Sequence, residues 1–268
     1  MKRFVSLLAA LLLFFSAAAQ AEGTLRVAVR QDVAGFSYYN AKSGSWSGFE
    51  VDLAQLLARA LGYQEVAFVP VEISDREPAL RNGEADMVIA TFSITQTRAE
   101  RLHFSPAYFR EKTQVVVENS TMFDELSDLK GMRIGVIISA VNAEALVNKL
   151  AEEGIIPKGA GDRFDASSFD GGVHFRVYRT YNELFQALEL GEVDAACVDT
   201  WVVQSYMTSG RSFLPEVIST SDYGVALMPD SPLCDRVDQL ISGWLEDGTI
   251  ASLISKWELD EKMEAVNE

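Results

Sequence analysis

Residues 86–98 carry the residue types that best suit a small-molecule site. Residues 87–90 are apolar and predict a short buried strand. Hydroxyl residues then alternate with apolar ones as far as Thr95, which predicts the N-cap of a helix whose first turn holds Arg98. Hydroxyls and amides at a strand end, beside an arginine, suit a small carboxylate. The same residues also fit an ordinary strand-to-helix turn with Arg98 on the surface.

Polar residues follow three other predicted strands in the same way. Arg30, Ser139 and Asp199 each come just after an apolar run that predicts a strand. In open α/β sheets, ligands bind outside the carboxyl ends of the strands. We therefore expect these residues and Thr91 to face a cleft, although Asp199 also fits a helix N-cap.

The order of predicted elements occurs twice along the chain and favours an α/β fold. Strands are expected at 25–29, 66–71 and 87–90, and again at 133–138, 173–177 and 193–198. Helices are expected between and after them, at 54–61, 74–82, 143–153 and 181–190. This order predicts two units, each a mostly parallel sheet flanked by helices.

The second unit is expected to be inserted in the first. Lobe 1 would comprise residues 22–111 and 224–268, and lobe 2 residues 112–223. The chain would cross between them twice, near 110–114 and 220–226, and so form a two-strand hinge. Two lobes with polar strand ends facing each other can close on a small ligand. The role of the Gly-, Asp- and Ser-rich loop at 154–172 is left open.

The first 21 residues match a cleavable signal peptide. Lys2 and Arg3 precede an apolar run at 4–15, and an Ala-x-Ala site ends at Ala21. The run is shorter than the roughly 20 residues of a membrane span. Because no cysteine lies near the cut, we expect a periplasmic protein that is not a lipoprotein.

The composition argues against several kinds of partner. The formal net charge is −16, and loss of Lys2 and Arg3 lowers it to −18. Such acidity disfavours nucleic acids and anionic membranes. The sequence shows neither a metal-ligand spacing nor a glycine-rich phosphate loop, so we expect no metal and no cofactor. Cys197 and Cys234 fit buried free thiols, although export would permit a disulfide.

Three motifs together resemble the family 3 bacterial extracellular solute-binding proteins, the periplasmic amino-acid receptors of ABC importers. They are Gly-Phe-Glu-Val-Asp-Leu at 48–53, the run at 90–95 with Arg98, and residues 191–199. The similarity extends from about Leu25 to Trp257. It implies a two-lobed periplasmic binding protein fold of type II. It also implies a monomer that binds an amino acid and docks transiently on a membrane ABC permease.

The resemblance also implies roles for individual residues. Arg98 matches the arginine that grips the ligand α-carboxylate, with Thr91 and Ser93 supplying hydroxyl and amide contacts. We include Phe92, between them, among the ligand-binding residues. Asp199 matches the aspartate that takes the α-ammonium from the opposite lobe.

Other positions match the family less closely. Phe36 matches an aromatic residue that lines the pocket. Ser139 and Asn142 stand where the family usually has a Gly-Thr-Thr turn. Tyr181 falls near a ligand-facing polar position but fits a core residue at the start of a helix as well.

Two further arginines bear on the ligand's side chain. Arg30 and Arg76, with the residues around them, resemble those of the glutamate and aspartate receptors, so we expect an acidic ligand. Glutamine, asparagine and basic amino acids are the alternatives. In a competing interpretation, the arginines pair with acidic neighbours and only shape the lobe; the candidate partners are Asp32, Asp75 and Glu77.

An enzyme on the same scaffold is the rival function, because cyclohexadienyl dehydratases resemble these receptors. Chemistry would require a general acid or base in the cleft. The two histidines, His103 and His174, lie near no serine or cysteine nucleophile pattern, and His103 fits a structural role. Glu50 is a candidate acid that also fits a helix start. We therefore expect a receptor with no catalytic residues.

Overall fold

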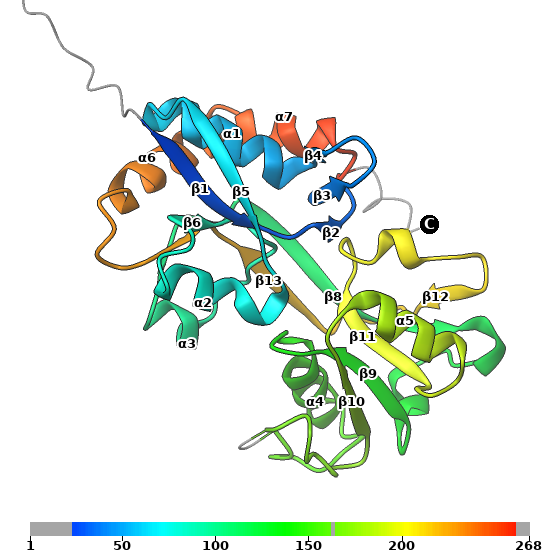
Figure 1. Ribbon diagram of the computed structural model, residues 1–268. Helices are drawn as coiled ribbons and strands as arrows, with labels where there is room; N and C mark the ends of the chain where they lie inside the picture. Colours follow the sequence, from blue (N-terminus) through cyan, green and yellow to red (C-terminus); the bar gives the residue numbers. More distant parts are fainter. Residues whose placement is uncertain (1–22, 162–163, 261–268) are drawn as a thin grey trace, which may run out of the picture.

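The computed structural model describes residues 23–161 and 164–260, which form two lobes (Figure 1). The predicted signal peptide lies outside the described residues. Each lobe is built on its own sheet, and a small third sheet belongs to the first lobe. Among the described residues, no helix is long and apolar enough to cross a membrane.

Lobe 1 contains a five-stranded sheet in the order β5-β1-β6-β14-β7. Its strands are β1 (Thr24–Val29), β5 (Glu65–Pro70), β6 (Met87–Val88), β7 (His103–Phe104) and β14 (Ala226–Leu227). The helices of this lobe are α1 (Phe49–Leu61), η1 (Ile73–Asp75), α2 (Arg76–Arg81), α3 (Gln96–Ala99), α6 (Cys234–Glu246) and α7 (Thr249–Lys256). Strands β2 (Asp32–Val33), β3 (Ser37–Asn40) and β4 (Ser45–Ser47) form the small sheet.

Lobe 2 contains a sheet in the order β10-β9-β11-β8-β12, and β13 also pairs with β8. Its strands are β8 (Phe109–Glu118), β9 (Arg133–Ile137), β10 (His174–Tyr178), β11 (Ala195–Asp199), β12 (Arg211–Phe213) and β13 (Ser219–Tyr223). Its helices are η2 (Asn119–Thr121), η3 (Leu126–Leu129), α4 (Asn142–Glu152), α5 (Tyr181–Glu189) and η4 (Gln204–Tyr206).

Both sheets are mixed. Three neighbouring strands in each are parallel: β5, β1 and β6 in lobe 1, and β10, β9 and β11 in lobe 2. Antiparallel strands complete each sheet, because the chain that leaves or re-enters a lobe pairs without a helical crossover. The parallel strands therefore follow the predicted βαβ order, and the two-lobed α/β fold is confirmed.

The hinge is an antiparallel pair formed by β8 and β13. Their register runs from Thr113 opposite Ser219 to Phe109 opposite Tyr223. Strand β8 passes from lobe 1 into the sheet of lobe 2, and β13 returns beside it (Figure 1). This pair is the predicted two-strand hinge. Residues 111 and 223 lie in β8 and β13, and the lobe boundaries expected there stay a prediction.

Successive side chains of β11 point to opposite faces of the sheet, and this explains how lobe 2 buries both faces. Ala195 and Cys197 pack in the cluster that contains α4, whereas Ala196 and Val198 pack in the cluster that contains α5. The loop at 154–172 extends the first of these clusters, because Phe164 and Phe169 pack against Phe175 on β10. Cys197 and Cys234 are both buried and free.

Gly48 fixes the turn that leads into α1. Its φ of 131° and ψ of 167° lie in a region that side chains disfavour strongly. A Cβ atom there would lie 2.1 Å from the carbonyl oxygen of Phe36. Glycine at this position therefore permits the close approach of α1 to the chain before β3.

We predict that Gly48→Ala destabilises the protein by about 2–5 kcal/mol, from backbone strain and overlap with Phe36. Gly83→Ala is the matched control in the same lobe. Its φ is also positive, at +68°, but a Cβ there meets nothing within 4 Å. The control should cost only about 1–2 kcal/mol. Urea unfolding followed by circular dichroism measures both, and equal losses would contradict the close-approach argument.

Candidate functional site

A narrow cleft lies between the lobes at the carboxyl ends of the strands. Its empty volume is about 280 Å3. The cleft brings together six of the predicted site residues. Thr91, Ser93 and Arg98 follow β6, and Arg76, Tyr181 and Asp199 come from α2, α5 and β11. The lining residues are Ile73, Arg76, Thr91, Ser93, Arg98, Ala140, Val141, Tyr181 and Asp199.

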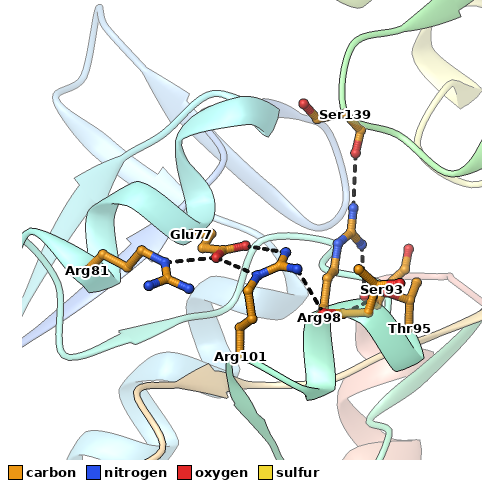
Figure 2. A network of polar contacts seen from close by, with 8 residues as sticks. Glu77, Arg81, Ser93, Thr95, Arg98, Arg101 and Ser139 are labelled. Atoms are coloured by element: carbon orange, nitrogen blue, oxygen red, sulfur yellow. Dashed lines mark hydrogen bonds and ion pairs between the residues drawn. The ribbon is translucent and has the colours of Figure 1, made fainter. Parts of the chain in front are cut away.

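Arg98 spans the cleft. The predicted N-cap is present, since the backbone N–H of Arg98 donates to the hydroxyl of Thr95 at 3.2 Å. Its guanidinium donates from Nη1 to the carbonyl of Ser93 at 2.8 Å, and from Nη2 to that of Ser139 in lobe 2 at 3.0 Å (Figure 2). Burial lowers the pKa of Arg98. Neutral carbonyls thus orient this cation, and no described residue forms an ion pair with it.

Arg76 is a second cleft cation and is fully buried. Its Nε donates to the carbonyl of Ile73 at 2.9 Å, and its Nη1 to the carbonyls of Ala90 at 3.2 Å and Thr91 at 2.9 Å. The pKa of Arg76 is lowered to about 9, mainly by burial and to a smaller extent by the neighbouring charges of Arg98 and Arg30. Within the described part of the chain it has no carboxylate at ion-pair distance.

Phe92 lies against both cleft arginines. The guanidinium carbon of Arg76 is 4.4 Å from the centroid of its ring, and that of Arg98 is 4.7 Å away. An aromatic face attracts cations and leaves their edges free to donate hydrogen bonds. The ring therefore holds two positive charges close together beside the cleft.

Asp199 supplies the opposite charge from lobe 2. Its Oδ1 accepts from Nδ2 of Asn142 at 2.7 Å and from the hydroxyl of Thr113 at 3.2 Å, and its Oδ2 accepts from the hydroxyl of Tyr223 at 2.9 Å. Burial raises the pKa of Asp199, against the effect of these donors. No cation among the described residues pairs with this carboxylate.

Thr91 adopts a strained conformation that two charged side chains maintain. Its φ is +46°, which is rare for a β-branched residue. Its backbone N–H donates to Oε1 of Glu50 at 2.6 Å, and its carbonyl accepts from Arg76. The amide of Thr91 is therefore not free for a ligand, contrary to the expectation from sequence.

Glu50 positions this strand end from behind the cleft. The fully buried carboxyl also accepts from the hydroxyls of Tyr108 at 2.7 Å and Ser37 at 3.3 Å, and burial raises its pKa. It is not among the residues that line the cleft. Its position beneath Thr91 fits a supporting role better than that of a general acid.

Besides Arg30 and Phe92, three predicted site residues do not line the cleft. Phe36 is fully buried in an aromatic cluster with Phe49, Phe109 and Tyr223 and does not line the cleft. Asn142 orients Asp199 with its side chain. Ser139, with a φ of +61°, offers its carbonyl to Arg98 and lines the hollow outside the cleft.

Arg30 pairs with an acidic neighbour, as the competing interpretation expected, but one of its nitrogens has no partner. Its Nε and Nη2 donate to the two carboxylate oxygens of Asp32 at 2.8 and 2.6 Å. Its buried Nη1 has no hydrogen-bond partner among the described residues. The guanidinium carbon lies 5.9 Å from the centroid of the Tyr181 ring, so Arg30 reaches an element of lobe 2 from lobe 1.

Sequence reasoning missed two residues that hold the site. Tyr223 ends the hinge strand β13 and donates to Asp199, but its sequence neighbourhood indicates only extended chain. Thr113, on the other hinge strand, gives no local signal either. His103, for which a structural role was expected, lies with Nε2 3.0 Å from Oδ1 of Asp238 and is not among the residues that line the cleft.

The arrangement is complementary to a small zwitterion. Two cations line the lobe 1 side and one carboxylate lies on the lobe 2 side, and neutral dipoles hold all three in place. The titratable residues that line the cleft are Arg76, Arg98, Tyr181 and Asp199. Among the described residues, no cluster of three or more His, Cys, Asp or Glu side chains is suited to a metal ion.

Comparisons with known proteins identify the family of the chain. The profile of the bacterial extracellular solute-binding proteins, family 3, matches residues 25–260. The chain is 25% identical to the ABC transporter glutamine-binding protein GlnH of Bacillus subtilis, over 85% of this chain and 79% of the relative. It is 24% identical to the glutamate-binding protein GluB of Corynebacterium glutamicum, over 89% of this chain and 80% of the relative.

Solved structures resemble the whole two-lobed fold. An ancestral arginine-binding protein bound to arginine has a TM-score of 0.72 and 29% identity, covering 88% of this chain and 98% of its own. The ancestral amino acid-binding protein AncCDT-1, a precursor of cyclohexadienyl dehydratase, has a TM-score of 0.69 and 28% identity, covering 88% and 95%. The chain therefore belongs to family 3 of the bacterial extracellular solute-binding proteins.

Proposed function

We propose that this protein is a periplasmic receptor that captures an L-amino acid between its lobes and delivers it to an ABC permease. One observation carries the proposal: Arg98 and Asp199 line the same cleft from opposite lobes, and neither forms an ion pair with a residue that the structure describes. The ligand α-carboxylate would bind Arg98, and its α-ammonium would bind Asp199. Hinge closure would then bring both lobes onto the ligand.

The energetic demand on this site is modest. Micromolar affinity corresponds to about 8 kcal/mol. Hydrogen bonds to charged groups contribute about 1.5–3 kcal/mol each, and a narrow cleft excludes most of the water that would weaken them. Association also costs at least about 4 kcal/mol in lost freedom of the ligand. Contacts of the ligand's side chain must therefore add to those of its two charged groups.

The ligand's side chain is best matched by an acidic group. Arg76 lines the cleft, is fully buried and has no carboxylate partner among the described residues. A ligand carboxylate would offset the cost of burying this charge. Arg30 is the weaker contributor, because Asp32 already occupies two of its nitrogens. Glutamate or aspartate is therefore favoured over glutamine, asparagine or a basic amino acid.

An enzyme of the cyclohexadienyl or arogenate dehydratase kind is the second candidate, and AncCDT-1 motivates it. The cleft offers Asp199 as its carboxyl group, and three hydrogen bonds already orient this group in lobe 2. The described lining includes neither histidine nor cysteine. Binding without turnover is the simpler function of such a site.

We expect a thermal-shift screen of the twenty amino acids to show stabilisation by glutamate or aspartate. A ligand present at 100 times its Kd stabilises the folded state by about 2.7 kcal/mol. Arg98→Ala should remove the response, because loss of a buried charge contact costs about 2–5 kcal/mol. Arg133→Ala is the control and should retain the response, because Arg133 forms an ion pair with Asp194 outside the cleft. Turnover of prephenate or arogenate, without an amino-acid response, would favour the enzyme.

We predict that amino-acid affinity decreases as the pH falls through the pKa of Asp199. Burial raises this pKa in the protein without ligand, and the ligand ammonium would lower it again by favouring the carboxylate. Binding then releases a proton, and affinity declines from a pH above the ordinary aspartate pKa of about 3.9. Calorimetry with L-glutamate across the acidic range measures this. Asp199→Asn should bind weakly and keep only the decline caused by the ligand's own side-chain carboxylate, near its ordinary pKa of about 4.3. An unchanged profile in Asp199→Asn would refute the ammonium assignment.

Specificity should depend most on Arg76. Arg76→Gln is expected to weaken glutamate binding by at least about 30-fold, because it removes a buried charge contact. Glutamine binding should change much less, since a neutral amide does not depend on that charge. Arg30→Gln should show the same selectivity to a smaller extent, through its unpartnered Nη1. Equal losses for glutamate and glutamine, measured by calorimetry, would assign either arginine a purely structural role.

A further inference from the structure

A second hollow adjoins the cleft on lobe 1, with an empty volume of about 790 Å3. Four arginines and one carboxylate line it: Arg76, Arg81, Arg98, Arg101 and Glu77. It shares Arg76 and Arg98 with the cleft, so the two spaces meet at the residues assigned to the ligand. We call this hollow the arginine groove.

Glu77 holds the two outer arginines of the groove in place. It accepts at Oε1 from Nε of Arg81 at 2.8 Å and from Nε of Arg101 at 3.0 Å, and at Oε2 from Nη2 of Arg101 at 3.0 Å (Figure 2). Hydrogen bonds from Arg101 and Arg81 lower the pKa of Glu77 to about 2. The carboxylate therefore stays ionised at neutral pH.

The outer arginines retain donors toward solvent. The Nη1 and Nη2 atoms of Arg81 make no hydrogen bond within the described part of the chain, and its side chain is 46% exposed. Arg101 is 43% exposed and gives its Nη1 to the carbonyl of Thr97. Arg101 lies between Arg81 and Arg98 (Figure 2). An anion that arrives from solvent thus meets oriented guanidinium groups before it reaches the cleft.

Stability does not account for this arrangement. Exposed ion pairs contribute about 0–1 kcal/mol. One carboxylate between two arginines leaves a net positive charge, and Arg98 and Arg76 increase it to three among the ionised side chains of the groove. Like charges repel, so the cluster needs a reason other than folding.

We propose that the arginine groove is an approach site that steers an acidic amino acid into the cleft. The inference rests on the acidic ligand proposed above. The protein carries a net charge of −16, which repels an anionic ligand at long range. A groove of local positive charge reverses that field where the ligand enters, and focused fields of this kind raise association rates by about 10- to 1,000-fold. The ligand carboxylate then passes from Arg81 and Arg101 to Arg98.

Stopped-flow tryptophan fluorescence with L-glutamate and L-glutamine tests this proposal on the purified protein. Arg81→Gln and Arg101→Gln should each slow glutamate association about threefold at low salt, and the double variant about tenfold. Dissociation rates and glutamine association should stay within about twofold, because the groove acts on charge during approach. The differences should shrink as added salt shortens the Debye length toward about 3 Å.

Two further variants separate steering from a structural effect. Arg26→Gln is the matched control, because Arg26 is also 43% exposed and paired with a carboxylate, Asp86, but lies in β1 away from the groove lining. It should leave glutamate association unchanged. Glu77→Gln removes the one negative charge of the groove lining and should accelerate glutamate association at low salt. Slower association in Glu77→Gln would contradict steering by the net charge of the groove.

The outcomes distinguish this proposal from the proposed function. If glutamate binds every variant with unchanged association rates, or if Arg26→Gln slows association as much as Arg101→Gln, the steering role is wrong and the receptor assignment stands. Equal slowing of glutamate and glutamine would also overturn it. If glutamate and aspartate do not bind the unaltered protein at all, the acidic specificity fails and the approach site fails with it.

Discussion

The cleft depends on one constraint: a charge buried in a protein must be compensated. Among the described residues, Arg76 and Asp199 are compensated by neutral dipoles alone, carbonyls for the cation and hydroxyl and amide groups for the carboxylate. Dipoles fix the position of a charge without cancelling it. The two lobes therefore present opposite net charges to the same space, and a ligand that carries both charges stabilises their approach best.

The same constraint connects the site to the hinge. Thr113 and Tyr223, which donate to Asp199, lie on the two strands of the hinge, β8 and β13. A rotation about these strands moves the donors as well as the lobes. In lobe 1, Glu50 from the start of α1 fixes the strained backbone of Thr91. The proposed ligand contacts thus depend on supports from distant parts of the chain, and we expect residues outside the cleft to affect binding.

These supports mark the limit of what the sequence could predict. The spacing of apolar residues and the polar residues at strand ends are local signals. They predicted the two lobes, the hinge and the Thr95 cap, and they placed Thr91, Arg98 and Asp199 at the cleft. They do not determine which neighbour a side chain meets after folding. Phe36 fits a pocket wall as well as a core, and its ring packs in the core. Tyr223 carries no local signal, because its role arises only from the contact with Asp199.

The distribution of arginines suggests that selectivity and speed arise from different residues. Arg26 and Arg133 each pair with one carboxylate, whereas Arg81 and Arg101 share Glu77, and Arg76 and Arg98 bind carbonyls. Positive charge therefore exceeds negative charge around the cleft, although the chain as a whole is acidic. A buried arginine such as Arg76 affects mainly how long a ligand stays, because its contact must break on release. Exposed ones affect mainly how fast it arrives. The acidic ligand that we propose for this acidic protein would require both.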